Sequence, residues 1–485
     1  MPMKNNLQNR RDFLKTTAMS IAVTSLPGCS EGKQSFGSNR EKPNLLFIMT
    51  DQQRSDALSI AGNTVLETLN LDRLAKQGAY FKNAYSPCAV CCPARSSVLT
   101  GHTVENTHMR TNGLAYYPKE KGLMAMPTFD EILTDEGYHC EYYGKWHSLS
   151  SHTDIYKNPV QASKNGNSVF DHGGQKFVWL DSIRDKEPIR PLKPGEFYDN
   201  MSERPYRTNS IDRHHGKTPD ELKALSIRVT QSDQHGELLI GPENTLTAYQ
   251  AKQTIAAIER LKDKPFSITC SFHFPHSPML PVEPYHSMYP AKDMTPPVSI
   301  DDDMSNSPYE ATNGRKRLLE YRDKEKIKYM ISNYYGLVKE IDDWMGEMLS
   351  TLDRCGLRDN TLVIYVSDHG EMLGSHGMRE KNVFYEESAH IPLLMRFPRR
   401  IKRNTTVDGY VSMIEMMIPY SVDSEVINAL YDLNTDPHEM KNLIGKNPDR
   451  HRYAGKTEEL RASLLEWLKK NRSSHYEGVK KRKLI

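Results

Sequence analysis

The chain has 485 residues, of which 37% are hydrophobic, and this composition is typical of a globular protein with a sizeable core. Basic and acidic residues nearly balance at a net charge of +2, and no run of Lys and Arg is interleaved with aromatic residues. Composition and charge therefore indicate neither nucleic acid nor an acidic surface as a partner, and we predict no nucleic-acid binding. The length suggests one large domain and a smaller one.

The first 29 residues have the features of an export signal. Arg10-Arg11 precedes a mildly apolar stretch at residues 16–28 that is too short to span a bilayer. This pattern resembles a twin-arginine signal, which implies recognition by the twin-arginine export machinery. The sequence Leu26-Pro27-Gly28-Cys29 resembles a bacterial lipobox, in which Cys29 would be lipidated and become the mature N-terminus. We expect a protein exported to the bacterial periplasm or lipid-anchored on a membrane facing the periplasm or exterior. A linker at residues 30–42 would follow the signal. The alternative to an export signal is that the N-terminus is a disordered basic tail.

Three short apolar runs predict buried strands that end in polar residues. Residues 44–50 lead into Asp51, residues 265–272 lead into a His-rich segment, and residues 362–367 lead into Asp368. Polar side chains at such positions are typical of a site at the carboxyl edge of a parallel sheet.

Two segments have the apolar spacing and end signals of helices. Thr128 and Glu131 form the pattern of a capping box, which predicts a helix that stops near Gly137. A longer helix is predicted for residues 324–355, with Gly356 just beyond its end. Buried strands alternating with helices predict an α/β sandwich. Residues 150–245 are rich in polar residues with weak periodicity, which favours long surface loops over the strand ends.

Three of the seven cysteines, Cys88, Cys91 and Cys92, stand within five positions. A zinc site would need a second ligand pair at comparable spacing, which the other cysteines do not provide, and a redox C-x-x-C motif is expected in a small thioredoxin-like unit. Pro93 suits the first helical position, which places Cys91 just before a helix N-terminus, where free N–H groups favour an anion. Arg95 is unfavourable in a first helical turn, and its presence there suggests that it serves a bound anion.

The pattern Cys91-x-Pro93-x-Arg95, followed by Leu-Thr-Gly at residues 99–101, resembles the signature of formylglycine-dependent, type I arylsulfatase-like sulfatases of the alkaline phosphatase superfamily. The resemblance extends over most of the chain and gives a catalytic domain at residues 43–400. It implies an alkaline-phosphatase-like α/β sandwich, with a mostly parallel central sheet flanked by helices and a small C-terminal α+β subdomain. In this family a maturation enzyme oxidises the signature cysteine to formylglycine, which is the catalytic nucleophile. The resemblance implies that Cys91 is the modified residue and that Cys88 and Cys92 are bystanders.

Two pairs of residues match the metal-binding pairs of the family. Asp51-Gln52 follows the first predicted strand, with Gln52 where many members have aspartate, and Asp368-His369 follows the last, with His369 where others have asparagine. The resemblance implies that these four residues and modified Cys91 bind one Ca²⁺ ion. Carboxylate and amide oxygens suit such a hard cation, although a histidine nitrogen is an atypical ligand for it.

Four further positions match catalytic residues of the family. Lys145 and His147 lie in Gly-Lys-Trp-His at residues 144–147, His276 lies in Pro-His-Ser-Pro, and Lys381 lies in a charged run. The resemblance implies that Arg95, Lys145 and Lys381 neutralise the sulfate, that His276 protonates the departing alcohol, and that His147 and Asp368 assist at the hydrated aldehyde.

The C-terminal part departs from the family pattern. Several tens of residues that usually precede a closing motif similar to residues 430–443 are missing, so we expect an abbreviated subdomain and a basic tail at residues 401–485. The predicted catalytic positions all lie upstream of this departure.

The sequence therefore predicts a sulfuric ester hydrolase acting on a sulfated saccharide. A phosphonate or phosphate ester hydrolase is the alternative enzyme, because related folds use the same metal pair and formylglycine. A catalytically silent glycan-binding lipoprotein is the alternative of a different class.

Overall fold

The structure is a computed structural model, which describes residues 42–107, 109–112, 127–148, 179–199, 201–208, 235–309, 319–412, 428–470 and 476–481. The predicted export signal, the lipobox and all but the last residue of the predicted linker lie outside these residues. None of the helices in the described part is long and apolar enough to cross a membrane.

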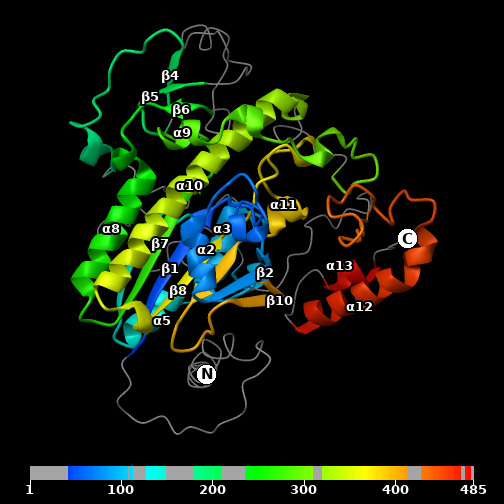
Figure 1. Cartoon of the computed structure of the whole chain (residues 1–485). Helices are drawn as coiled ribbons and strands as arrows, with labels where there is room; N and C mark the ends of the chain where they lie inside the picture. The colour runs from blue at the N-terminus through cyan, green and yellow to red at the C-terminus, as the bar shows by residue number, and fades with distance from the viewer. Residues whose placement is uncertain are drawn as a thin grey trace, which may run out of the picture.

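A large mixed sheet forms the centre of the molecule (Figure 1). Strand β1 (Asn44–Asp51) lies between β8 (Thr361–Ser367) and β7 (Phe266–Pro275), parallel to both. The full order in the described residues is β10-β2-β9-β8-β1-β7-β3, with the further strands β10 (Thr405–Ser412), β2 (Ala79–Tyr85), β9 (Leu393–Arg396) and β3 (His139–Gly144). The three predicted strands are thus confirmed, and β7 continues three residues beyond its predicted end.

Strand β9 runs antiparallel to both of its neighbours, β8 and β2, whereas β10 pairs with β2 in parallel. Because β9 returns beside β8, the segment between Asp368 and Pro392 leaves and re-enters the sheet at the same edge. That edge also holds the carboxyl ends of β1 and β7.

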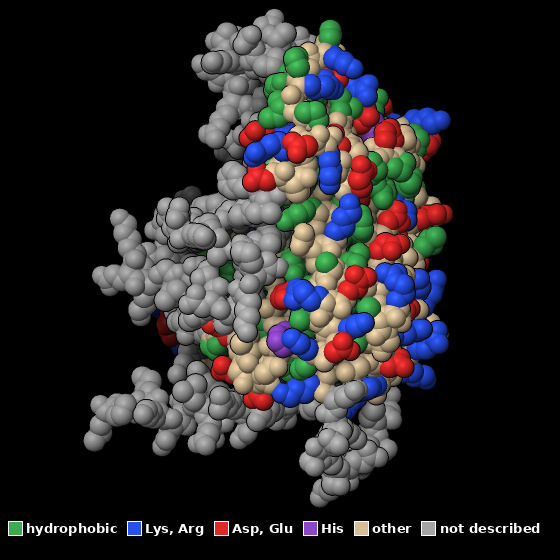
Figure 2. All heavy atoms as spheres, turned by 90° about the vertical axis from the view of Figure 1, so that its left-hand side faces the viewer, with side chains coloured by type: hydrophobic (Ala, Val, Ile, Leu, Met, Phe, Trp, Pro, Cys, Tyr) green, Lys and Arg blue, Asp and Glu red, His purple; other side chains and the backbone are tan. Residues whose placement is uncertain are grey.

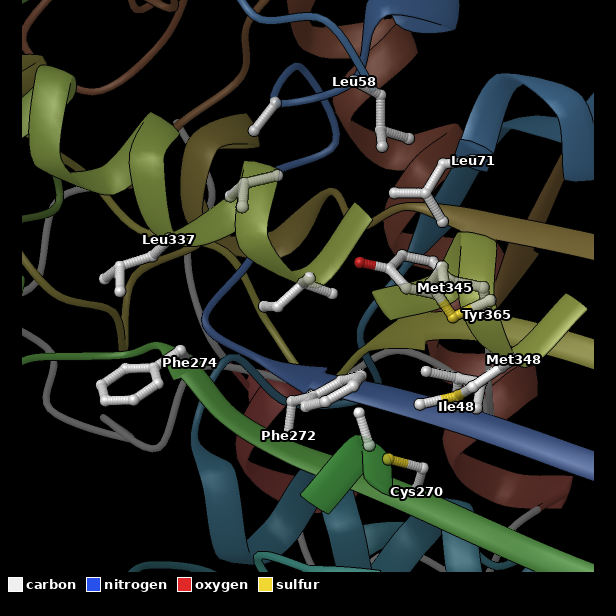
Figure 3. Packing of buried hydrophobic residues seen from close by; sticks show 14 of the residues in the cluster. Ile48, Leu58, Leu71, Cys270, Phe272, Phe274, Leu337, Met345, Met348 and Tyr365 are labelled. Carbon is white, nitrogen blue, oxygen red and sulfur yellow. The ribbon is translucent and has the colours of Figure 1, made fainter. Parts of the chain in front are cut away.

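The two faces of the sheet carry separate apolar clusters. Along β1, Leu46 and Ile48 point to one face, whereas Phe47 and Met49 point to the other, as the two-residue period of a strand requires. The first face packs against α2 (Leu69–Lys76), α8 (Leu246–Leu261) and α10 (Lys324–Arg354) (Figures 1 and 3). The second face is covered by α3 (Cys91–Thr100) and α5 (Phe129–Asp135).

The structure contains both of the helix-end signals that the sequence predicted. The Thr128 hydroxyl accepts from the Glu131 amide and the Glu131 carboxylate accepts from the Thr128 amide, which confirms the capping box of α5. Helix α10 ends at Arg354, with Gly356 just beyond it at a φ of 69°. This left-handed conformation explains the glycine.

The predicted start of the helix after the cysteine cluster is wrong by two residues. Helix α3 begins at Cys91 itself, with Val90 as its N-cap, so Pro93 occupies the third helical position and not the first. The position tolerates proline because the first N–H groups of a helix have no intrahelical partner. Cys91 is therefore part of the first turn.

The described part of residues 150–245 is not all loop. Strands β4 (Glu196–Tyr198), β5 (Pro205–Arg207) and β6 (Glu237–Leu238) form a small antiparallel sheet at one end of the molecule. Further α-helices in the described part are α4 (Val104–Thr107), α9 (Tyr285–Met288), α11 (Glu386–Ala389), α12 (Ala454–Lys470) and α13 (Tyr476–Lys481). Short 3₁₀ turns complete the described part: Ser59–Ala61, Pro242–Asn244, Ala291–Asp293, Val298–Asp301, Leu319–Arg322, Arg358–Asn360, Ser375–Gly377 and Arg450–Tyr453.

The division into a catalytic domain and an abbreviated C-terminal subdomain stays a prediction. Strand β10 lies beyond residue 400 and still belongs to the main sheet, and residues 413–427 lie outside the described part. Figure 2 shows the face on the left of Figure 1, where basic and acidic side chains are interspersed. This view shows one face only, and the expected lack of a nucleic-acid partner stays a prediction.

Candidate functional site

The carboxyl ends of β1 and β8 meet the first turn of α3 in a buried cluster of possible metal ligands. The cluster consists of Asp51, Cys91, Asp368 and His369, and one ligand atom from each lies within 4.8 Å of the others. The Cys91 Sγ lies 3.1 Å from His369 Nε2 and 3.9 Å from Asp51 Oδ1. The sheet topology explains this grouping, since parallel strands bring their carboxyl ends to one edge.

Arg95 joins the two carboxylates of the cluster. Its Nε lies 2.7 Å from Asp368 Oδ2 and its Nη2 lies 3.0 Å from Asp51 Oδ2. Its Nη1 donates to the Ser271 hydroxyl and to the Lys145 carbonyl. The sequence suggested that this arginine serves a bound anion; in the structure its three nitrogens are engaged by the protein, and the anions that it serves are the two aspartates.

Lys145 and His147 follow strand β3 into the same site. The Lys145 Nζ lies 2.5 Å from Asp51 Oδ2 and 4.0 Å from the Cys91 sulfur. His147 is buried, and burial together with the positive charge of Lys145 lowers the pKa of its ring well below the usual value. The ring is therefore neutral and can accept a proton.

Lys381 and His276 approach from the other side of the cluster. The Lys381 Nζ donates to Gln52 Oε1 at 2.5 Å and lies 3.0 Å from His276 Nε2. Burial and the nearby charges of Lys381 and Lys145 lower the pKa of His276 well below the usual value. Gln52 contributes its backbone amide to Asp368 and its side-chain amide nitrogen to Glu371, so its role as a metal ligand stays a prediction.

The charges around Cys91 favour its ionised form. Burial and Asp51 act to raise the pKa of the thiol, but Lys145, Lys381 and His369 outweigh them and lower it to about 6. Burial raises the pKa of both Cys88 and Cys92 above the usual value. Of these three thiols, only that of Cys91 has a lowered pKa; that it is the reactive residue and its neighbours are bystanders stays a prediction.

The donor set of the cluster fits a cation. The His369 Nδ1 lies 2.9 Å from the Gly370 carbonyl oxygen, which places a hydrogen on Nδ1 and leaves Nε2 facing Cys91. Burial acts to lower the pKa of this ring, but the charges of Asp368 and Cys91 raise it above the usual value, so a bound cation would take the place of a proton on Nε2. The aspartates are coupled: burial acts to raise the pKa of Asp51, but Lys145 and other cations hold it well below the usual value, whereas burial and the Asp51 charge raise that of Asp368. A cation placed between these groups would relieve the repulsion between the two carboxylates.

Two residues that position the site were not predicted. Ser271 accepts from Arg95 and donates to the Lys145 carbonyl at 2.7 Å, and its only signal in the sequence is a polar residue inside a buried run. Glu371 accepts from the Gln52 side chain and from the amides of Leu373 and Glu380. It follows Asp368 by three residues, but nothing in its spacing indicates which groups it contacts.

Comparison with known protein families identifies the family to which this arrangement of residues belongs. The profile described as Sulfatase matches residues 43–419. Among similar proteins, an ulvan-active sulfatase of Formosa agariphila is 29% identical over 451 residues, which cover 90% of this chain and 74% of that protein. An N-acetylglucosamine-6-O-sulfatase of Bacteroides thetaiotaomicron is 26% identical, with 81% of this chain and 69% of that protein covered.

Among solved structures, a phosphonate monoester hydrolase of Agrobacterium radiobacter superimposes with a TM-score of 0.64 at 20% identity, covering 90% of this chain and 96% of the other. At that identity the likeness shows the fold alone. Together with the mostly parallel sheet and its flanking helices, it confirms the predicted alkaline-phosphatase-like sandwich.

Proposed function

Since this chain belongs to the sulfatase family and is a sulfuric ester hydrolase, we propose that it removes sulfate from a sulfated saccharide, with a formylglycine made from Cys91 and a bound Ca²⁺ ion. One observation carries the proposal: Cys91 stands in the first turn of α3 with two carboxylates on one side and the ammonium groups of Lys145 and Lys381 around it. A helix N-terminus and two cations favour a sulfate group at this position.

Asp51, Asp368 and His369 would hold the metal, together with Gln52 and the modified residue 91. Four of these five groups offer oxygen atoms, which supports Ca²⁺ over a soft metal. The ion would supply Lewis-acid neutralisation of sulfate oxygens, and the hydrated aldehyde would supply one hydroxyl to attack sulfur and a second to release sulfate. Arg95 keeps both aspartates in place through its two ion pairs.

The remaining side chains divide the work of charge and proton transfer. Lys145 and Lys381 would neutralise the sulfate oxygens as charge shifts toward the leaving oxygen, and their burial strengthens this effect. His276 would pass a proton to the departing alcohol through Nε2. Because its low pKa keeps the ring neutral, that proton would come from the ammonium of Lys381, whose Nζ lies 3.0 Å from Nε2. His147 would take or hold a proton at the nucleophile, with Asp368 as the second candidate for this role.

The saccharide as substrate rests on the similar proteins. One of them is named for activity on ulvan and another for an N-acetylglucosamine sulfate. A panel of sulfated oligosaccharides, with release of inorganic sulfate as the readout, tests the proposal and identifies the sugar. If protein that carries formylglycine desulfates none of these oligosaccharides, the proposal is contradicted.

The modification itself is tested on protein purified from its native host. Mass spectrometry of the peptide spanning residues 87–95 is expected to show an aldehyde or its hydrate at position 91. An intact thiol at that position would contradict the catalytic proposal and favour the silent glycan-binding alternative.

A phosphonate ester hydrolase is the second candidate, because the fold also superimposes on an enzyme of that class. Matched aryl sulfate and phosphonate esters distinguish the two functions. Faster turnover of the phosphonate would reverse the order of the proposals.

We also propose that the protein is exported and lipid-anchored at Cys29, on the basis of the sequence pattern at residues 10–29. Labelling of the native protein with a radioactive fatty acid is expected, and the variant Cys29→Ala should lose the label. If that variant is exported but not cleaved before residue 29, lipid anchoring and translocation are separate steps.

A further inference from the structure

A buried arginine outside the predicted set contacts the residue next to the proposed acid. Arg379 is 3% exposed, and its Nη2 donates to the Ser277 hydroxyl at 2.8 Å. Ser277 is itself buried and directly follows His276 in the chain. Because the arginine is covered, it cannot serve as a contact for a large substrate, and its hydrogen bond to Ser277 is the link through which it can act on His276.

Ser277 in turn holds the His276 ring. The Nδ1 of His276 lies 2.7 Å from the Ser277 carbonyl oxygen. A carbonyl oxygen only accepts, so Nδ1 must carry the hydrogen, and Nε2 is left as the atom that gains and loses the catalytic proton. This is the atom that lies 3.0 Å from the Lys381 Nζ.

Two constraints keep the Ser277 carbonyl in place. Pro278 follows Ser277 and restricts its backbone to extended conformations. Arg379 fixes the Ser277 side chain, and its guanidinium carbon lies 5.4 Å from the centre of the Tyr321 ring. Pro278 therefore limits the backbone of Ser277 to extended conformations, and the hydrogen bond from Arg379 favours one of them.

One loop positions both basic residues, Arg379 and Lys381, beside His276 and Ser277. Hydrogen bonds from the Met372 amide to the Glu380 carbonyl, at 2.8 Å, and from the Gly374 amide to the Met378 carbonyl, at 2.7 Å, fold residues 372–380 back on themselves. Arg379 and Lys381 leave this loop two residues apart, one toward Ser277 and the other toward the His276 ring.

We propose that Arg379 and Ser277 form a clamp that positions His276 for proton transfer to the leaving group. The proposal rests on the proposed role of His276 and adds two positioning residues to it. The clamp acts on His276 and not on Lys145 or the aspartates, so its loss should affect departure of the alcohol and leave the initial charge neutralisation intact.

The test is a series of aryl sulfates whose phenols differ in acidity, assayed with Ser277→Ala and Arg379→Lys. An acidic phenol departs without help, whereas a weakly acidic phenol needs the proton. We expect both variants to lose about tenfold in kcat on the least acidic phenol and less than twofold on 4-nitrophenyl sulfate, because loss of positioning removes part of the 10²–10⁴-fold effect of an acid. Equal losses across the series would overturn the clamp.

A double-mutant cycle separates positioning from a general structural effect. In the background His276→Ala, the change Ser277→Ala should cost less than twofold, because its effect acts through the missing ring. Full additivity of the two losses would refute the proposal. Wild-type turnover of the series tests the proposed function, and only the dependence on phenol acidity tests the clamp.

Two controls cover folding. Arg396→Lys alters another buried arginine, which pairs with Val363 of β8, about 16 Å along the strand from Asp368. It should keep the wild-type dependence on phenol acidity. If Arg379→Lys fails to fold, Ser277→Ala still tests the link, and a crystal structure of that variant with an unmoved His276 ring would overturn the proposal without any turnover.

Discussion

Glu340 on α10 is a buried carboxyl group that should make the protein less stable as the pH rises. Its side chain is 1% exposed and accepts a hydrogen bond from the hydroxyl of Thr245, the N-cap residue of α8. Burial raises the pKa of Glu340 from 4.5 to about 8, and the nearby charge of Asp343 acts in the same direction. The folded protein therefore keeps a proton that the unfolded chain loses above pH 4.5.

The size of the effect follows from the difference between the two pKa values. A group with a raised pKa in the folded state stabilises fully below its unfolded pKa, and this contribution is lost as the pH rises toward the folded value. At about 1.4 kcal/mol per pH unit, the loss reaches on the order of 3 kcal/mol at pH 7. The substitution Glu340→Gln keeps the acceptor for Thr245 but cannot ionise, so it should remove this loss.

Denaturant unfolding followed by circular dichroism between pH 5 and pH 8 measures the effect. We expect the variant to match the wild type near pH 5 and to exceed its free energy of unfolding by on the order of 3 kcal/mol at pH 7. Glu325→Gln, on the exposed side of the same helix, controls for the loss of one negative charge. Parallel curves for wild type and Glu340→Gln across the pH range would refute the reasoning.

Three further outcomes are expected. Cys91→Ala should abolish release of sulfate, whereas Cys88→Ala should retain most of it, because burial raises the pKa of the Cys88 thiol and leaves it inert; sulfate release by both would contradict the assignment. Removal of the metal with a chelator should lower activity and thermal stability together, and added Ca²⁺ should restore both; restoration by Zn²⁺ alone would exclude calcium. Thr128→Ala should lower the free energy of unfolding by about 1 kcal/mol in denaturant titrations, since it removes the capping box of α5, and no change would show that the cap contributes nothing.

The central strands could be predicted because both of their faces are buried. β1, β7 and β8 lie in the middle of the sheet and read as continuous apolar runs, with Asp51 and Asp368 at or just beyond their ends. The small sheet of β4, β5 and β6 could not be predicted, because strands of two or three residues are too short to show alternation.

The sequence identified side chains that the structure brings together, but it did not show which of them pair; that they form the active site stays a prediction. Spacing and resemblance identified Arg95 as a cation beside Cys91, yet its partners lie 44 and 273 residues away in the chain. The same holds for Glu371 and Ser271, whose contacts depend on the order of strands in the sheet. Long-range hydrogen bonds of this kind leave no periodicity in a sequence.

The reversed direction of β9 has a consequence for how the site could be exchanged between proteins. Because β8 and β9 form a hairpin-like pair, the 25 residues between them, from Asp368 to Pro392, approach and leave at one rim. They carry both the proposed metal-binding pair, Asp368 and His369, and Lys381, which contacts the opposite half of the site. This segment can be treated as one unit: transplanted whole from a relative, it would bring the counterparts of Asp368, His369, Arg379 and Lys381 together, while the strands that receive it keep their register.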